Sequence, residues 1–193
     1  MVRRGILFVI SGPSGVGKGT IKDALLLKLQ DIKLSISATT RSMREGEMEG
    51  LDYFYLSPEE FTAKLENDEF LEYAPVYSNM YGTPRKYVMD NIQRGYDVLL
   101  EIDIQGALKV KDKMPEGVFI FIQPPSIEAL AQRINGRGKD SPESIQTRLA
   151  ACREEMAMVI HYDYLVINDE LDEAMNKVQS IIIAERCRVK NMY

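Results

Sequence analysis

The chain has 193 residues, of which 45% are hydrophobic and 27% charged, a composition typical of one globular domain. Its 24 basic and 29 acidic side chains give a formal charge of −5, which argues against DNA or RNA as the main ligand. The apolar runs are too short to span a bilayer, and two cysteines and one histidine suit neither a disulfide framework nor a zinc cluster, so we expect a protein of the reducing cytoplasm.

Short apolar runs rich in β-branched and aromatic residues recur between longer helical patterns. In chain order they are residues 6–10, 33–37, 97–102, 118–122 and 164–167. Runs this apolar are typical of strands buried on both faces, and helices between them imply right-handed crossovers in a parallel sheet. The pattern predicts an α/β fold with a five-stranded parallel sheet and flanking helices.

The first run leads directly into a glycine-rich loop, ISGPSGVGKGT, at residues 10–20. Gly12, Gly17 and Lys18 fit the phosphate-binding pattern G-x-x-x-x-G-K-[ST] in its required place between a strand and a helix. Gly19 stands where that pattern has a hydroxyl, and Thr20 follows one step later. Inward backbone N–H groups, a helix N-terminus and the lysine charge together predict a nucleotide phosphate site, with an ordinary glycine-rich turn as the alternative.

Two stretches interrupt the alternation of strands and helices. Residues 38–95 combine charged turns with aromatic-rich short strands, and helices are expected to start near Ser57-Pro58 and Thr83-Pro84. Residues 124–150 predict a helical hairpin with a glycine-flanked tip, the shape of a lid, and Ser141-Pro142 opens its second helix. A last helix is predicted over residues 170–188 from apolar positions three and four apart.

With the loop, five further segments make the chain resemble guanylate kinase, a family of P-loop nucleoside monophosphate kinases. The segments are SISATTRSMREGEMEGLDYFYLS, FLEYAPVYSNMYGTP, EIDIQG, RINGRGKDSPESIQTRL and VIND, in the family's order and spacing. The resemblance implies a fold of the P-loop NTP hydrolase type in a single domain over residues 1–193. Its core would be 1–36, 96–123 and 151–193, with a small mixed α/β GMP-binding insert at 37–95 and a helical lid at 124–150.

The activity that the resemblance implies is ATP-dependent phosphorylation of GMP, and of dGMP as well, in purine nucleotide metabolism. The acceptor is already an anion, so direct in-line transfer needs no general base. Mg²⁺ would accompany ATP, held mainly by phosphates and water near Thr20 and Glu101; the family often has aspartate where this chain has Glu101. We expect no nucleic-acid or membrane partner, and the choice between monomer and homo-oligomer stays open.

For ATP, the resemblance implies binding by Ser14, Gly15, Val16, Gly17, Lys18, Gly19, Thr20 and Asn168. Lys18, Arg41, Arg137 and Arg148 would be catalytic, the last two as arginine fingers on the transferring phosphoryl group. Five basic and two acidic side chains lie between positions 133 and 153, so positive charge gathers in the predicted lid. Asn168 would equally suit a cap of the last helix, and Arg133 and Arg153 a solvated helix face.

For GMP, the resemblance implies binding by Ser37, Arg41, Arg44, Tyr53, Glu72, Tyr81, Thr83 and Asp103. The arginines and tyrosines would hold its phosphate, since guanidinium forks match phosphate oxygens. The two carboxylates would accept hydrogen bonds from guanine N1–H and N2–H₂, and the two small hydroxyls would reach O6. Considered singly, each residue also has an ordinary structural role. Glu72 would then be a surface charge and Asp103 a helix cap, while the arginines would be solvated turn residues and the tyrosines would pack in a small sheet.

Two other functions compete with this interpretation. A related module that binds peptides without catalysis would share the fold, but such modules typically lack the loop and lid residues that this chain keeps at Lys18, Arg137 and Arg148. A kinase for another nucleoside monophosphate would share the loop and would not need Glu72 and Asp103.

Overall fold

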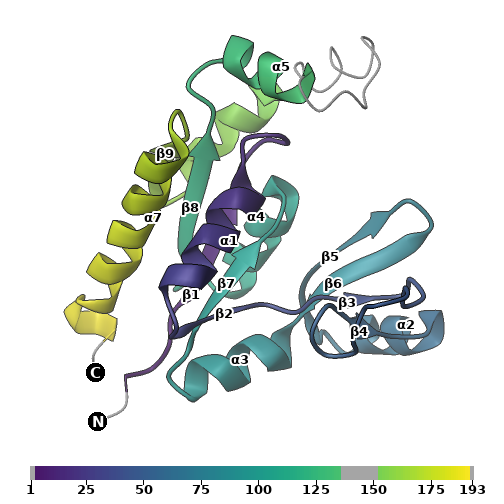
Figure 1. Ribbon diagram of the computed structural model, residues 1–193. Helices are drawn as coiled ribbons and strands as arrows, with labels where there is room; N and C mark the ends of the chain where they lie inside the picture. Colours follow the sequence, from purple (N-terminus) through teal and green to yellow (C-terminus); the bar gives the residue numbers. More distant parts are fainter. Residues whose placement is uncertain (1–2, 136–151, 192–193) are drawn as a thin grey trace.

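The computed structural model describes residues 3–135 and 152–191, and its centre is a five-stranded parallel sheet with the strand order β2-β7-β1-β8-β9. Figure 1 shows these strands side by side, with the helix α1 (Lys18–Lys28) drawn in front of them. The strands are β1 (Leu7–Ser11), β2 (Ile32–Leu34), β7 (Asp97–Glu101), β8 (Val118–Gln123) and β9 (Tyr164–Ile167). Every apolar run expected to be a core strand contributes to this sheet, so the predicted parallel architecture is confirmed.

The second of these strands is shorter than the sequence predicts. β2 ends at Leu34, although the amide of Ser35 still donates to the carbonyl of Leu99, 2.9 Å away. Beyond that point the chain leaves the central sheet, and Ala38 begins a strand of a second sheet. The predicted run 33–37 therefore contains both the end of one strand and the crossing to another sheet.

Helices cover both faces of the central sheet. One face is covered by α1 (Lys18–Lys28) and α7 (Leu171–Arg186), and the other by α3 (Arg85–Gln93) and α4 (Ile104–Lys113). Successive residues of β1 alternate between the two cores: Phe8 packs with α1 and α7, whereas Val9 packs with α3 and α4. This alternation explains why β1 is apolar along its whole length.

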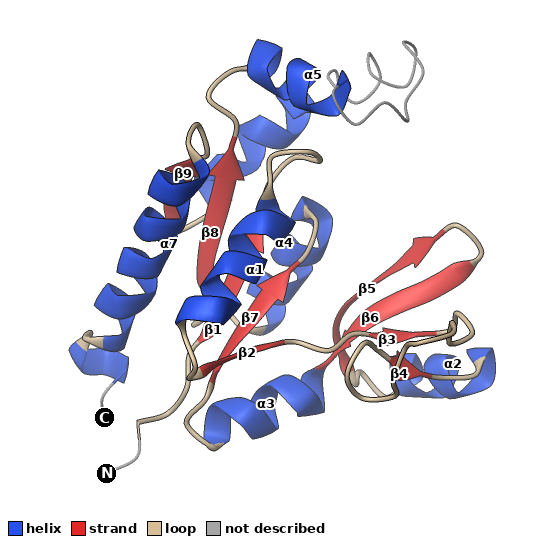
Figure 2. Cartoon of the chain, in the orientation of Figure 1, coloured by secondary structure: helices blue, strands red, loops and turns tan. Residues whose placement is uncertain are grey.

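A second sheet, with the order β4-β3-β6-β5, lies beside the core in Figure 2. It consists of β3 (Ala38–Thr39), β4 (Phe54–Tyr55), β5 (Phe70–Val76) and β6 (Asn79–Pro84). The helix α2 (Pro58–Glu66) packs on it through Phe61, whose ring stacks on Phe70 at 4.5 Å between centroids. This sheet therefore has a small core of its own, separate from the two cores of the central sheet.

Of the three expected helix starts, those near Ser57-Pro58 and Thr83-Pro84 are confirmed, the second with Pro84 rather than Thr83 as its cap, and the third lies outside the described residues. Ser57 caps α2: its side chain accepts from the amide of Glu60, and the Glu60 carboxylate accepts from the amide of Ser57. Thr83 does not open α3, because it lies within β6 and Pro84 takes the N-cap position. The hydroxyl of Thr83 donates instead to Glu72, and the predicted start at Ser141 falls outside the described ranges.

The remaining described helical segments are short or lie late in the chain. They are α5 (Ile127–Asn135), helical residues 152–157, and the 3₁₀ turns η1 (Met158–His161) and η2 (Val189–Asn191). In the described parts of the chain we find no helix with the length and apolar character needed to cross a bilayer. Because parallel strands all end at one edge of the sheet, the loops after β1, β7 and β9 converge there.

Candidate functional site

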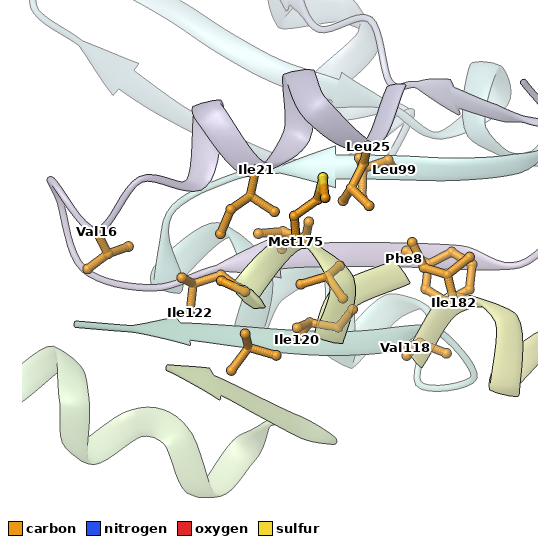
Figure 3. Close-up of a cluster of buried hydrophobic side chains, with 14 of the residues drawn as sticks. Phe8, Val16, Ile21, Leu25, Leu99, Val118, Ile120, Ile122, Met175 and Ile182 are labelled. Carbon is orange, nitrogen blue, oxygen red and sulfur yellow. The ribbon is translucent and has the colours of Figure 1, made fainter. Parts of the chain in front are cut away.

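The glycine-rich loop after β1 is fixed by one buried side chain and by the close approach of two of its glycines to neighbouring atoms. Val16 is fully buried and belongs to the hydrophobic cluster of Figure 3, so it anchors the middle of the loop. Gly12 and Gly17 have φ angles of 145° and 92°, which favour glycine. A β-carbon at Gly12 would lie 2.1 Å from the carbonyl oxygen of Ile122, and one at Gly17 would lie 2.6 Å from Asn168 Nδ2. The loop shape therefore depends on these glycines.

Lys18, at the start of α1, is held against its own loop. Its Nζ donates to the carbonyl oxygens of Gly12 and Pro13, at 2.6 and 3.0 Å. An ammonium group has three N–H donors, so one is left to face an anion in the loop. Burial lowers the pKa of Lys18, and the charges of nearby carboxylates, Glu101 first, act in the opposite direction. The lysine is thus positioned before any phosphate arrives.

The loop forms one wall of a cavity of about 490 Å³. Three carboxylates line the same cavity: Glu101 and Asp103 from the end of β7, and Glu155 from the helical residues 152–157. The sequence did not single out Glu155 as a site residue, because Glu155 belongs to none of the motifs described above. Burial raises its pKa, whereas the charge of Lys18 lowers it. We call this cavity the loop pocket.

Glu101 faces the glycine that replaces the usual hydroxyl of the loop. Its carboxylate oxygens lie 3.6 and 3.8 Å from the place that a β-carbon at Gly19 would occupy. One of the same oxygens is 3.2 Å from Lys22 Nζ, so the carboxylate is paired with a cation of α1. An acidic oxygen therefore stands close to the position where the common pattern would place a serine or threonine.

A second cavity, of about 160 Å³, lies between the central sheet and the smaller one. Ser37, Tyr53 and Thr83 line it from the smaller-sheet side. Glu101 and Ile102, at the end of β7, line both this cavity and the loop pocket. The two cavities are therefore neighbours across the end of one strand, and we call the second one the insert pocket.

Two predicted carboxylates converge on the start of α4. Glu72 is only 9% exposed and accepts a 2.6 Å hydrogen bond from the Thr83 hydroxyl, so it is not the surface charge that its residue type suggests. Asp103 is the N-cap of α4 and accepts from the amide of Gly106 at 2.7 Å. A β-carbon at Gly106 would lie 3.3 Å from Glu72 Oε2 and 3.4 Å from Asp103 Oδ1. Burial, with a further contribution from Asp103, raises the pKa of Glu72 above its ordinary value.

Arg41 is paired with a carboxylate that the sequence did not single out. Its guanidinium donates to both oxygens of Glu47, at 3.0 and 2.7 Å. Glu47 also accepts from the Tyr55 hydroxyl at 2.7 Å and from the amide of Arg44 at 2.8 Å. These bonds, that from Arg41 above all, lower the pKa of Glu47 to about 2. Glu47 thus orients the arginine and compensates its charge.

The two predicted tyrosines lie beside this pair. The guanidinium carbon of Arg41 is 5.4 Å from the ring centroid of Tyr53. Tyr53 and Tyr81 meet edge to face at 5.8 Å between centroids. The side chain of Arg44 is exposed, so in this structure it is less constrained than its three neighbours. The structure therefore brings together Arg41, Tyr53 and Tyr81.

Asn168 and Arg133 do not take the alternative roles of helix cap and solvated surface charge. Glu170 is the N-cap of α7, so Asn168 does not cap that helix; its side chain donates to the carbonyl of Val16 at 2.7 Å. Arg133 does not lie on a freely solvated face, because its guanidinium donates to backbone carbonyls after β9. Arg153 is exposed, as expected. Arg137 and Arg148 lie outside the described residues.

Comparison with known proteins gives consistent matches. The family model described as guanylate kinase matches residues 4–185. A guanylate kinase of Syntrophomonas wolfei is 60% identical over 192 residues, covering 100% of this chain and 98% of its own. One from Caldanaerobacter subterraneus is 57% identical, covering 99% and 94%.

Solved structures match in the same way. The crystal structure of guanylate kinase from Anaplasma phagocytophilum has a TM-score of 0.74 and 36% identity, covering 98% of this chain and 90% of that one. A shikimate kinase from Bacteroides thetaiotaomicron, at 14% identity and a TM-score of 0.51 over 92% and 98%, is similar in fold alone.

Proposed function

Because the chain belongs to the guanylate kinase family, we propose that its loop pocket holds the phosphates of ATP and that its insert pocket holds GMP. The protein is a phosphotransferase that converts ATP and GMP into ADP and GDP. The convergence of Glu72 and Asp103 beside the insert pocket carries the assignment of the acceptor. The lining residues shared by the two cavities support direct transfer between neighbouring nucleotides.

Selection of guanine follows from the chemistry of these two carboxylates. An ionised carboxylate only accepts hydrogen bonds, and guanine offers N1–H and N2–H₂ on its pairing edge. Thr83 already occupies one oxygen of Glu72 and Gly106 one oxygen of Asp103, so each carboxylate keeps an oxygen for the base. Adenine lacks these donors and would leave buried oxygens unpaired, which disfavours its binding. Ser37 would donate to O6, Thr83 would do so only if its hydroxyl proton turned away from Glu72, and dGMP would bind in the same way.

Charge and position would account for the catalysis, since the attacking phosphate oxygen needs no base to activate it. On the donor side, Lys18 and the loop amides from Ser14 to Thr20 would hold the ATP phosphates, and Asn168 would complete that site. On the acceptor side, Arg41, Arg44, Tyr53 and Tyr81 would hold the GMP phosphate. Arg137 and Arg148, outside the described residues, are proposed as the groups that stabilise the transferring phosphoryl group.

The chain can accommodate Mg²⁺ without a dedicated protein cage. Within residues 3–135 and 152–191 no group of three or more His, Cys, Asp or Glu side chains is arranged to hold a metal ion. Thr20 and Glu101 do line the loop pocket, and hard oxygen donors of this kind suit a hydrated Mg²⁺. When bound with ATP, the ion would neutralise charge on the β- and γ-phosphate oxygens. We therefore propose Mg²⁺ as cofactor, held through phosphates and water.

A coupled assay with ATP and a panel of acceptors tests this function. We expect turnover with GMP and dGMP and little with AMP, UMP or CMP. Glu72→Gln places an N–H₂ group against the donor edge of guanine and should lower kcat/KM for GMP by about 10²-fold or more. Glu69→Gln, at an exposed position three residues earlier, is the matched control and should behave like the wild type. A preference for AMP or a pyrimidine nucleotide would contradict the guanine assignment.

A further inference from the structure

Arg133 joins α5 to the loop that follows β9. Its two terminal nitrogens donate to the carbonyl oxygens of Asn168 and Asp169, at 2.8 and 2.9 Å. The guanidinium fork suits two successive acceptors, whereas a lysine ammonium is a point charge without a fixed fork. The partners are backbone atoms, so this contact fixes the course of the loop rather than the position of one side chain.

Asn168, whose backbone Arg133 holds, in turn contacts the glycine-rich loop. It is 5% exposed, and its amide N–H donates to the carbonyl of Gln123 at 2.8 Å, which places it beside β8. Its side-chain Nδ2 donates to the carbonyl oxygen of Val16 at 2.7 Å. The contact is tight, because a β-carbon at Gly17 would come within 2.6 Å of the same nitrogen. Asn168 is therefore fitted between β8 and the glycine-rich loop.

The Val16 carbonyl determines where a phosphate-binding donor points. The carbonyl of Val16 and the N–H of Gly17 belong to one planar peptide unit and point in opposite directions. A hydrogen bond that holds this carbonyl against Asn168 therefore orients the N–H of Gly17. Gly17 lines the loop pocket, as Lys18 does. The orientation of this peptide thus depends on Asn168, and the place of Asn168 depends on its neighbours.

We propose that Arg133 is a positioning residue for the phosphates of ATP, which acts through Asn168 on the peptide between Val16 and Gly17. This inference rests on the proposed function only in taking the loop pocket as the ATP phosphate site. It assigns to Arg133 a role in the nucleotide-free protein, in place of the solvated helix face that the sequence suggests. The role concerns the phosphates and is independent of the nucleobase.

Binding of ATP and of inorganic tripolyphosphate, measured by calorimetry without GMP, tests the proposal. Tripolyphosphate has no base, so Arg133→Ala should weaken both ligands by the same factor, about tenfold, the scale of one lost charge-assisted hydrogen bond. Arg133→Lys keeps the charge without the fork and should show most of this loss. Arg188→Ala, which removes an arginine that contacts Glu185 in α7, is the control and should bind both ligands normally. Weaker ATP binding with unchanged tripolyphosphate binding would overturn the proposal.

Two further measurements separate positioning from a general structural effect. The losses of tripolyphosphate affinity in Arg133→Ala and Asn168→Ala should not add up in the double variant, because both substitutions break the same chain of contacts. Full additivity would contradict the proposal. In the nucleotide-free protein, hydrogen exchange should accelerate in residues 14–20 relative to the core amides of β7 in both variants. Unchanged relative exchange would overturn the proposal. If tripolyphosphate failed to bind the wild type, the site assignment itself would be wrong, and the inference would fall with it, whatever the enzyme does with GMP.

Discussion

Lys18 shows how single residues prepare the loop pocket. Two carbonyls fix its ammonium group. Burial lowers the pKa of Lys18, because the charged form is poorly solvated there. Lys18→Ala should therefore keep the fold and lose turnover by about 10²-fold or more, the scale for one preorganised electrostatic donor. Steady-state rates together with a melting curve check this. Lys28→Ala, in the last turn of the same helix, is the control, and near-normal turnover in Lys18→Ala would exclude the lysine from catalysis.

Glu72 links recognition to stability. Its pKa is raised in the folded protein, chiefly by burial, so ionising it costs folding free energy. The cost is absent below the ordinary value of 4.5 and grows as the pH rises towards the raised value. Glu72→Gln should thus stabilise the nucleotide-free protein at pH 7, and the gain should shrink near pH 4.5. Urea unfolding at both pH values measures it; a difference independent of pH would show that the charge is not the cause.

The residues that sequence analysis missed share a physical reason. Glu47 lies within a segment that we used, but its importance comes from the bidentate contact with Arg41, which the turn around it creates. Glu155 reaches the loop pocket from a helix far along the chain, and Arg133, expected on a solvated helix face, donates instead to backbone carbonyls, a contact that a pattern of side chains does not reveal. The sequence identifies residues that belong to a motif, such as Lys18. It does not identify residues that reach the site, or contact a site residue, only after the chain has folded.

Elements were predictable where the local signal agrees with the packing. Ser57 and Glu60 form their capping box within four residues, so the start of α2 could be read directly. Thr83-Pro84 has a similar local signal, but the buried Glu72 takes the threonine hydroxyl and β6 extends through Pro84. The central strands were identified because burial on both faces makes them apolar throughout, whereas the end of β2 depends on where the chain crosses to the other sheet.

The cap of α2 gives a test at this scale. Ser57→Ala removes the acceptor for the Glu60 amide and should destabilise the protein by about 1 kcal/mol, as N-cap truncations typically do. Ser57→Asp keeps an acceptor oxygen and should remain close to the wild type. Urea denaturation of the three proteins compares them. Equal stability of the alanine and aspartate variants would show that the hydrogen bond contributes nothing measurable.

At the scale of the whole molecule, Asp97 connects distant parts of the chain. It is fully buried at the start of β7 and accepts from Arg3, from the amide of Ile6 and from Arg186 of α7, at 2.8, 2.8 and 2.6 Å. Asp97→Ala would remove the buried carboxylate shared by Arg3 and Arg186, leaving Arg186 with the exposed Asp31 as partner, and should cost about 3 kcal/mol. Chemical denaturation measures this loss. Asp90→Asn, which removes an exposed pair with Lys86, should change stability by less than about 0.5 kcal/mol, and a similar effect in both variants would contradict the central role of Asp97.

The hydrogen bond from Asn168 to Val16 joins residues 152 positions apart. A contact of this span forms only after most of the chain has found its place, because the ends of a long loop must first be brought together. The phosphate-binding loop lies near the beginning of the chain, yet its final shape depends on a residue that the ribosome adds much later. ATP binding should thus appear with the last phase of refolding, and a chain still emerging from the ribosome would gain it only once residue 168 is free to pack.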